Sequence, residues 1–269
     1  MDITHILEAV KQAGMHAKKS FEQGIYKNSE SACIDVTEKS LNELVIKEDF
    51  ICEGIIISKI KEYNPNANIY SEESSDISKL KNDKSEIKYM IDPLDGTHNY
   101  FFGLPYWGIC VAVLNSENVS IASIIYVPMM DMLLKCEGIK KPSFILCNNS
   151  WNRIYTKPRP VSKSLVCYDN QFYKLGDRAI ETYNRISKKC FTTRITGSAV
   201  CDAALIATGK INARIWNKTN PYDIAAGMLI VAGAGGRVCD LKGNDINTLS
   251  EQVIMCSDAV LKDQLVKLI

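Results

Sequence analysis

The stretch DPLDGT, residues 92–97, carries the most information about how this chain folds and works. It follows the apolar run YMI, residues 89–91, which predicts a β-strand. Two carboxylates three positions apart therefore stand at the end of a strand, in a turn that contains a proline and a glycine. Mg²⁺ in proteins binds carboxylate oxygens, waters and substrate phosphates. Because turns are rich in Asp and Gly for conformational reasons alone, this stretch by itself would be weak evidence for a metal site.

Two other acidic segments accompany it. YSEES occupies residues 70–74, and NPYD at 220–223 leads into the apolar run 224–231, which is too hydrophobic for a surface helix. Alone, Asp223 would be explained as an N-cap whose negative charge complements the helix dipole. In the company of the other acidic segments it instead indicates a ligand in a shared site for a hard divalent cation.

The overall composition excludes several classes of function. Hydrophobic residues make up 46% and charged residues 23% of the 269 residues, which is typical of a soluble globular protein. The 32 Lys and Arg nearly balance the 31 Asp and Glu, so no global field favours a nucleic acid polymer or a membrane as partner. Only three histidines are present, which nearly excludes histidine-based zinc or triad chemistry.

The ten cysteines are scattered, with no C-x-x-C pair. Several lie in apolar strand-like runs, where a free cysteine behaves as a small hydrophobe. The sequence shows no signal peptide and no apolar run near 18 residues. We therefore expect a reduced, cytoplasmic protein.

The apolar periodicity predicts helices at 2–20 and 49–63, around 173–188 and 198–208, from residue 223 onward, and at 258–268. Strands are predicted at 87–92, 107–114, 119–127 and 132–136, with one more after the glycines at 233–236. Region 138–163, which contains three prolines, gives no clear assignment. No internal repeat or low-complexity linker divides the chain.

Four segments resemble the signatures of the inositol monophosphatase family: SEES at 71–74, DPLDGTHNY at 92–100, GSA at 197–199 and YDIAAG at 222–227. This family is a branch of the Mg²⁺-dependent, lithium-sensitive sugar phosphatases, which also include fructose-1,6-bisphosphatases and 3′-phosphoadenosine 5′-phosphate phosphatases. The resemblance covers nearly the whole chain in the family's order. It implies an α/β (α+β) fold, a layered α/β/α/β/α sandwich, and a homodimer.

The same resemblance implies one phosphatase domain over residues 1–269. Within it we expect a metal-binding half of about residues 1–140 and a substrate-binding half of about residues 141–269. A chain of this length can bury a large core, and α/β folds of this size often form one unit.

The resemblance also implies the metal ligands. Glu72, Asp92 and the Leu94 carbonyl hold one Mg²⁺, Asp92, Asp95 and Asp223 hold a second, and Glu72 helps to hold a third, weaker ion. A bridging role for Asp92 is physically sensible, because one carboxylate has two oxygens. Mn²⁺ is the expected substitute and Li⁺ the expected inhibitor.

Phosphate-monoester hydrolysis is among the slowest uncatalysed reactions, and attack by metal-activated water fits these residues. If residues 97–99 open a helix, their backbone N–H groups can bind phosphate, and Gly96 lets that backbone approach closely. By resemblance, the Thr97 hydroxyl orients the attacking water, and the acidic base is matched by Asp49. The segment before Asp49 departs from the family's V-T-x-x-D pattern, so Glu48 remains an alternative base. The resemblance also implies that Glu72 is a catalytic residue.

The expected substrate pocket draws on Gly197, Ser198 and Ala199 at a helix start, and on Asp95, Gly96 and Thr97 for the phosphate. Trp216 stands seven residues before Asp223, where inositol-preferring members carry a Glu that binds ring hydroxyls. Losing that carboxylate weakens polyol recognition. Trp216 could stack on a sugar or a nucleobase, or it could be a core aromatic.

Three functions remain open from the sequence. The leading one is a Mg²⁺-dependent phosphatase for a small sugar or polyol phosphate. The second is the same chemistry on 3′-phosphoadenosine 5′-phosphate, favoured by Trp216, the pair Thr219-Asn220 and the basic segment 153–163. The third is a non-catalytic binding or regulatory protein on the same scaffold, because a fold does not fix a function.

Overall fold

A computed structural model describes residues 2–26, 36–40, 43–169 and 171–269. The helices are α1 (Thr4–Tyr26), α2 (Lys47–Tyr63), α3 (Thr97–Phe101), α4 (Phe172–Leu175), α5 (Asp177–Ser187), α6 (Ala199–Ala207), α7 (Pro221–Gly233) and α8 (Ala259–Val266). The strands are β1 (Val36–Ser40), β2 (Glu43–Ile46), β3 (Asn68–Ser71), β4 (Lys88–Asp95), β5 (Gly108–Leu114), β6 (Ser120–Val127), β7 (Met132–Cys136), β8 (Ser143–Cys147), β9 (Ser150–Arg153), β10 (Leu165–Tyr168), β11 (Thr192–Arg194), β12 (Ala213–Trp216), β13 (Arg237–Cys239) and β14 (Val253–Cys256).

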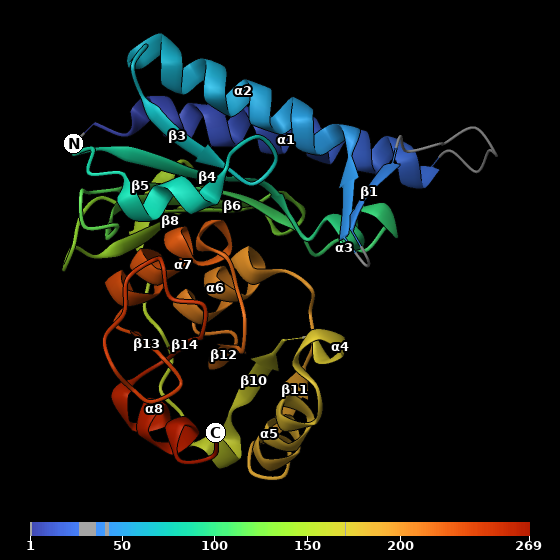
Figure 1. The fold of residues 1–269 in the computed structure, drawn as a ribbon, viewed down its shortest axis with the longest axis vertical. Helices are drawn as coiled ribbons and strands as arrows, with labels where there is room; N and C mark the ends of the chain where they lie inside the picture. The colour runs from blue at the N-terminus through green and yellow to red at the C-terminus, as the bar shows by residue number, and fades with distance from the viewer. Residues whose placement is uncertain (1, 27–35, 41–42, 170) are drawn as a thin grey trace.

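The larger sheet has seven strands in the order β3-β4-β5-β6-β7-β8-β9. Only β3 and β4 pair in parallel, and all the other neighbours are antiparallel. Strands β4 and β5 are buried along their whole length, because α1 and α2 cover one face and α6 and α7 cover the other (Figure 1). A sheet covered on both faces explains why these strands read as continuous apolar runs rather than as alternating patterns.

The second sheet has five strands in the order β11-β10-β12-β14-β13. Helices α6 and α7 pack between the two sheets, and α5 and α8 cover the outer face of the second one (Figure 1). The order from top to bottom in the figure is helix, sheet, helix, sheet, helix. This confirms the α/β fold and the predicted α/β/α/β/α sandwich. The larger sheet ends with β9 at Arg153, and the second sheet begins with β10 at Leu165. The predicted division of the chain near residue 140 into a metal-binding half and a substrate-binding half stays a prediction.

Most predicted elements are present, and the differences have local causes. The helix predicted around 173–188 is two helices, α4 and α5, separated by Gly176 with φ 66°. The unassigned region 138–163 contains the hairpin β8–β9, whose turn is made by Asn148 and Asn149, both at positive φ. Asn tolerates the left-handed region that two-residue hairpin turns need. The single strand expected after the glycines is a pair, β13 and β14.

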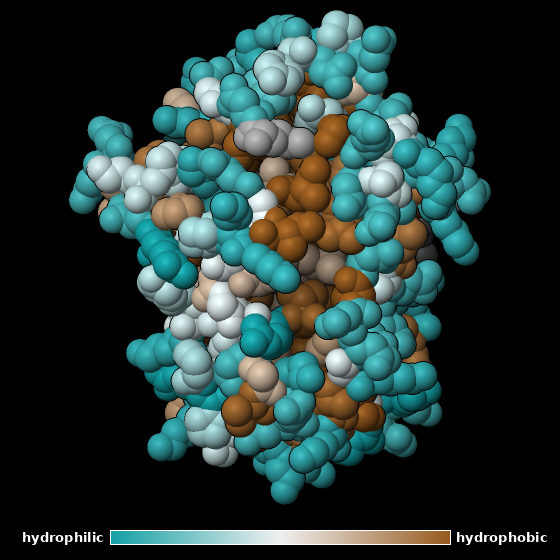
Figure 2. Space-filling model, turned by 90° about the vertical axis from the view of Figure 1, so that its left-hand side faces the viewer, coloured by the Kyte–Doolittle hydropathy of each residue, from teal (hydrophilic) through white to brown (hydrophobic). Residues whose placement is uncertain are grey.

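One face of the molecule carries a continuous strip of apolar side chains. Figure 2 shows this strip running down the face that lies on the left of Figure 1.

Within the described ranges, no helix combines the length and apolar character needed to cross a bilayer. The cysteines in those ranges are all free thiols, and most of them are buried.

Close packing of α1 on the larger sheet depends on Gly14. A Cβ at this position would lie 2.2 Å from Cδ1 of Tyr126. We therefore expect Gly14→Ala to lower the free energy of unfolding by about 1–3 kcal/mol, the usual penalty of overpacking. A Cβ at Gly24 on the same helix would meet no atom within 4 Å. Because alanine is favoured over glycine within a helix, Gly24→Ala should raise the free energy of unfolding by about 0.5–1 kcal/mol.

Urea denaturation of the two variants beside the wild type gives the comparison. Two changes of the same sign would show that α1 does not approach the sheet as described.

Candidate active site

A cavity of about 580 Å³ opens where the end of β4, α3 and the first turns of α6 and α7 meet. Its size suits a small molecule. Glu72, Asp95 and Asp223 line it, and so do Arg214, Trp216 and Lys218 from the second sheet and the segment after it. The segments singled out in the sequence therefore come together at one cavity.

Three carboxylates form the centre of the site. One carboxylate oxygen from each of Asp92, Asp95 and Asp223 lies within 4.8 Å of the others. Asp92 and Asp95 stand at the end of β4, where the register with β5 shifts between them. Glu72 follows β3, the parallel neighbour of β4, and its N–H donates to the Ile91 carbonyl at 3.2 Å. The pairing of β3 with β4 thus brings Glu72 to the same end of the sheet.

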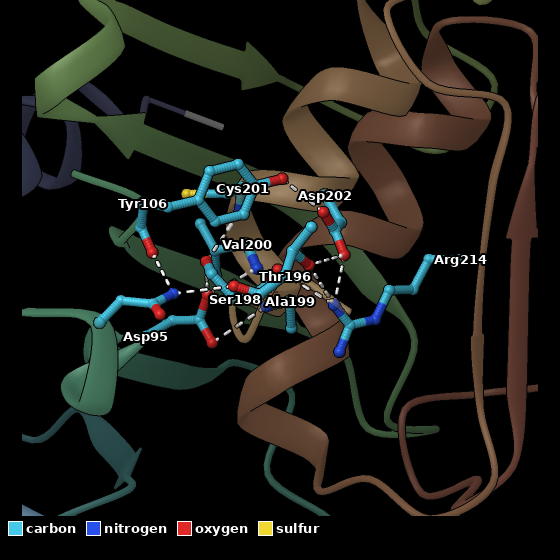
Figure 3. Close-up of polar contacts among 10 residues, drawn as sticks. Asp95, Tyr106, Thr196, Ser198, Ala199, Val200, Cys201, Asp202 and Arg214 are labelled. Carbon is cyan, nitrogen blue, oxygen red and sulfur yellow. Dashed lines mark hydrogen bonds and ion pairs between the residues drawn. The ribbon is translucent and has the colours of Figure 1, made fainter. Parts of the chain in front are cut away.

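The N-terminus of α6 holds Asp95 (Figure 3). The carboxylate accepts hydrogen bonds from the N–H of Val200 at 2.8 Å, from the N–H of Ala199 at 3.1 Å, and from the Ser198 hydroxyl. Free backbone N–H groups and the positive end of the dipole make a helix start a good anion site. These donors serve Asp95 in this structure, and substrate binding by Gly197, Ser198 and Ala199 stays a prediction.

Asp223 lies at the third position of α7, and Asn220 is the N-cap. Its Oδ2 accepts from the Asn220 N–H and from the Thr219 hydroxyl, both at 3.0 Å. The N-cap explanation of Asp223 is therefore wrong in its position, because Asn220 caps the helix, but Asp223 does take part in the capping box, and this is compatible with a ligand role. One oxygen closes the capping box, and a carboxylate so held is fixed in orientation at the mouth of a buried helix.

Asp92 has fewer hydrogen-bond donors than the other two members of the carboxylate cluster. Asp92 is 1% exposed, and its Oδ1 accepts from the Leu94 N–H at 3.2 Å. Its Oδ2 is buried and has no hydrogen-bond partner among the described residues. Buried carboxylate oxygens are normally bonded, so an unsatisfied one points to a missing partner. An all-oxygen donor set of this kind fits a hard divalent cation such as Mg²⁺.

The pKa values lead to the same conclusion. Burial raises the pKa of Asp92 well above its usual value, and the charges of Glu72, Asp95 and Asp223 raise it further. Burial also raises the pKa of Asp95, although Ser198 and the start of α6 oppose it. Burial raises the pKa of Asp223 to about 7. A divalent cation would reverse these shifts by compensating the negative charge.

Gly96 and Thr97 take the predicted places at the start of α3. Gly96 is the N-cap with φ 92°, and a Cβ there would lie 3.0 Å from the Tyr106 carbonyl oxygen, so only glycine fits this turn. The Thr97 hydroxyl donates to the Leu94 carbonyl oxygen at 3.1 Å. Both Leu94 and Thr97 line the cavity.

The two candidate bases differ in their surroundings. Asp49, 1% exposed, lies at the third position of α2 and accepts from the Ile46 N–H at 2.7 Å. Its charge contributes to the raised pKa of Asp92, so it lies near the cluster. Glu48 accepts from the Ser20 hydroxyl on α1 at 2.6 Å. The contacts favour Asp49 over Glu48, and the base role itself stays a prediction.

A buried ion pair beside the cavity does not follow from the sequence. Asp202 on α6 pairs with Arg214 on β12, and it also accepts from the Tyr106 and Thr196 hydroxyls (Figure 3). Helical periodicity places Asp202 on a helix but gives it no partner. The sequence contained one sign of this ion pair, which is that Arg214 interrupts the short apolar run that ends at Trp216. Trp216 itself is 3% exposed and lines the cavity, so it is a core residue with one face on the site.

Metal-free protein is expected to lose stability as the pH rises from about 4 to about 7. The three aspartates have higher pKa values in the folded than in the unfolded chain, so the folded protein binds more protons in this range. In a chelator, thermal unfolding should give a lower Tm at about pH 8 than at about pH 5, and the free energy of unfolding should be lower at pH 8 by at least about 2 kcal/mol.

Two additions make this measurement specific. Mg²⁺ should restore stability at the higher pH by binding the folded state, and Asp223→Asn should flatten the pH dependence. A Tm that rises with pH in chelator would contradict the repulsion between these groups.

The sequence pattern of the inositol monophosphatase family matches residues 2–269. A Thermotoga maritima protein named fructose-1,6-bisphosphatase/inositol-1-monophosphatase is 28% identical over 238 residues, 88% of this chain and 87% of that one. A Haemophilus influenzae protein named Nus factor SuhB is 29% identical over 267 residues, 97% of this chain and 93% of its own. The solved structure of extragenic suppressor protein suhB from Bartonella henselae, 22% identical, covers 99% of this chain and 97% of its own with a TM-score of 0.84, and so shows the same fold. The chain belongs to the inositol monophosphatase family.

Proposed function

We propose that this protein is a Mg²⁺-dependent phosphatase that hydrolyses a small phosphomonoester of a sugar or polyol. The observation that carries the proposal is the carboxylate cluster of Asp92, Asp95 and Asp223, with an unsatisfied buried oxygen, beside a cavity of about 580 Å³. Family membership supports it, and so does the phosphatase name of the Thermotoga maritima relative.

The ligand sets follow the family pattern. Glu72, Asp92 and the Leu94 carbonyl would hold one ion, and Asp92, Asp95 and Asp223 a second, with Glu72 supporting a weaker third. When bound, such ions supply positive charge that polarises the ester and lowers the pKa of water. Substitution by Mn²⁺ and inhibition by Li⁺ belong to the same proposal.

Thr97 positions the nucleophile in this proposal. Its single proton is donated to the Leu94 carbonyl, so the hydroxyl oxygen has only lone pairs to offer to a water. It therefore accepts a hydrogen bond from the water and orients it. Asp49 is the proposed acceptor of the proton that the water loses, and this proton does not pass through Thr97, whose own proton is donated to the Leu94 carbonyl. The backbone N–H groups that follow Gly96 are the proposed donors to the phosphate.

A covalent cysteine route has no support in the part of the chain that the structure describes. The C-x5-R spacing of cysteine phosphatases occurs once in the sequence, from Cys147 to Arg153. These two residues belong to the paired strands β8 and β9, away from the residues that line the cavity. A hairpin of this kind does not form the tight anion-binding loop that such a nucleophile needs.

Two other functions are each supported by one specific observation. An aromatic Trp216 in place of a hydroxyl-binding carboxylate favours 3′-phosphoadenosine 5′-phosphate as the substrate. A non-catalytic role is suggested by the Haemophilus influenzae relative, which is named as a Nus factor. Homodimer formation and a cytoplasmic location remain proposals as well.

Phosphate release from four esters distinguishes these functions. We would test inositol 1-phosphate, fructose 1,6-bisphosphate, histidinol phosphate and adenosine 3′,5′-bisphosphate with Mg²⁺, with Mn²⁺ and with a chelator. The proposal expects metal-dependent release from a sugar or polyol ester. Preference for the adenosine compound would favour the second function, and release from none would favour a binding protein.

Asp92→Asn tests the site directly. We expect it to reduce turnover at least about 100-fold, because it removes several kcal/mol of charge compensation from the metal site. The same change should raise the metal-free stability near pH 8, because a repelled buried carboxylate is lost. Asp131→Asn, at an exposed position with φ 51° that Asn tolerates, is the matched control. Turnover near that of the wild type in Asp92→Asn would refute the metal assignment.

A further inference from the structure

Arg214 is a buried cation in the wall of the cavity that the proposed hydrolysis does not use. Its side chain is 7% exposed. Its Nη1 donates to the Asp202 carboxylate, to the Thr196 hydroxyl at 3.0 Å and to the Ser198 carbonyl at 3.4 Å. Figure 3 shows these contacts converging on one nitrogen of the guanidinium. The Nε is buried and has no hydrogen-bond partner among the described residues.

The surroundings hold this guanidinium in one place. Arg214 and Trp216 are two positions apart on β12 and so point to the same face of the sheet. The guanidinium carbon lies 4.9 Å from the centre of the Trp216 ring, in a cation–π contact. Asp202 is itself held by the Tyr106 hydroxyl and by the Thr196 hydroxyl at 2.7 Å. The unused donors are therefore preorganised before any ligand binds.

Stability alone does not explain this arrangement. A buried ion pair is often no more stable than well-packed apolar side chains, and a donor left unsatisfied has a further cost. Burial opposes the charge, but the Asp202 carboxylate outweighs it, and the pKa of Arg214 is raised. The group is thus a permanent cation whose Nε–H has no partner in the described part of the chain, and arginine binds carboxylates and phosphates in a two-pronged geometry.

The position of Arg214 relates it to the substrate. It lines the same cavity as Asp95 and Asp223, and its charge acts on both carboxylates. Lys218, exposed at the same cavity, adds positive charge on this side. A substrate whose ester lies at the carboxylate cluster would extend its other end toward Arg214 and Trp216.

We propose that Arg214 determines specificity by binding a second anionic group of the substrate, a phosphate or a carboxylate. The substrate is then a phosphomonoester that carries another anion, rather than the phosphate of a neutral polyol. This inference rests on the proposed phosphatase function and narrows its substrate class.

The test compares kcat and KM for phosphate release from three kinds of ester with Mg²⁺. Inositol 1-phosphate has no second anion, 3-phosphoglycerate has a carboxylate, and fructose 1,6-bisphosphate and adenosine 3′,5′-bisphosphate have a phosphate. The wild type should favour at least one of the doubly anionic esters in kcat/KM by at least about tenfold, the effect of one charge-assisted pair. A preference for 3-phosphoglycerate identifies the second anion as a carboxylate, and a preference for either bisphosphate identifies it as a phosphate.

With saturating Mg²⁺, Arg214→Gln should lower kcat/KM for the preferred ester by at least about tenfold more than it lowers kcat/KM for inositol 1-phosphate, and mainly by raising KM. Arg214→Lys keeps the charge but loses the forked donors, and should recover part of the preference. Because Arg214→Gln leaves Asp202 buried without its partner, Arg214→Gln/Asp202→Asn is the second variant, with thermal unfolding as the check on folding. Arg237→Gln, at an exposed position on β13, is the control.

The outcomes separate the two proposals. Equal or better kcat/KM for inositol 1-phosphate in the wild type, or an equal loss on every ester in the variants, overturns the role of Arg214 and leaves the phosphatase function standing. If no ester is hydrolysed, the phosphatase function fails, and calorimetric titration with adenosine 3′,5′-bisphosphate and 3-phosphoglycerate decides the anion site. Binding that weakens about tenfold in Arg214→Gln supports it, and binding that is absent or unchanged overturns it.

Discussion

The repulsion among the clustered carboxylates is the constraint on which the rest of the site depends. Oxygens of Asp92, Asp95 and Asp223 lie within 4.8 Å of one another in a place largely shielded from water. Such a cluster stays together only if the fold holds each member. The end of β4 fixes Asp92, the start of α6 fixes Asp95, and the capping box of α7 fixes Asp223. The protein thereby stores unfavourable electrostatic energy that a bound cation can release.

Helix starts are the common device for holding these acids. Asp49 and Asp223 occupy the same third position in α2 and α7, and each accepts a backbone N–H from the residue that caps its helix. Asp95 belongs to a strand, yet it too is bound by the first amides of a helix. In each case, backbone N–H groups at a helix start orient a carboxylate that repulsion from the other acids would otherwise turn toward solvent.

The sequence predicted those parts that local chemistry determines. The turn after β4 needs a glycine at position 96, so the strand and turn of residues 89–97 could be predicted from the sequence, whereas the role of the two aspartates came from the other acidic segments and from the family resemblance. The buried strands could be predicted because a sheet covered on both faces leaves long apolar runs. The division of the predicted helix at Gly176, and the hairpin turn of Asn148 and Asn149, depend on single residues at positive φ, which apolar periodicity does not register.

Long-range partners could not be predicted in this way. The bond between Asp95 and Ser198 joins residues 103 positions apart, and the contact of Tyr106 with Asp202 spans 96. Arg214 shows the same limit more clearly. Its position on an apolar strand revealed an unusual residue, but only the approach of α6 to β12 shows that Nη1 is engaged while Nε has no partner among the described residues. The partners of Arg214, like the donors that hold Asp95, are therefore defined by tertiary contacts.

The most direct test of the central claim is the location of Mn²⁺ by its anomalous scattering in crystals of the protein. The account predicts a peak bounded by the carboxylates of Asp92, Asp95 and Asp223, with ligand distances near 2.1–2.2 Å, about those of a hard divalent cation. Crystals that bind Mn²⁺ elsewhere, or that leave these three carboxylates without an ion at saturating concentration, would contradict it.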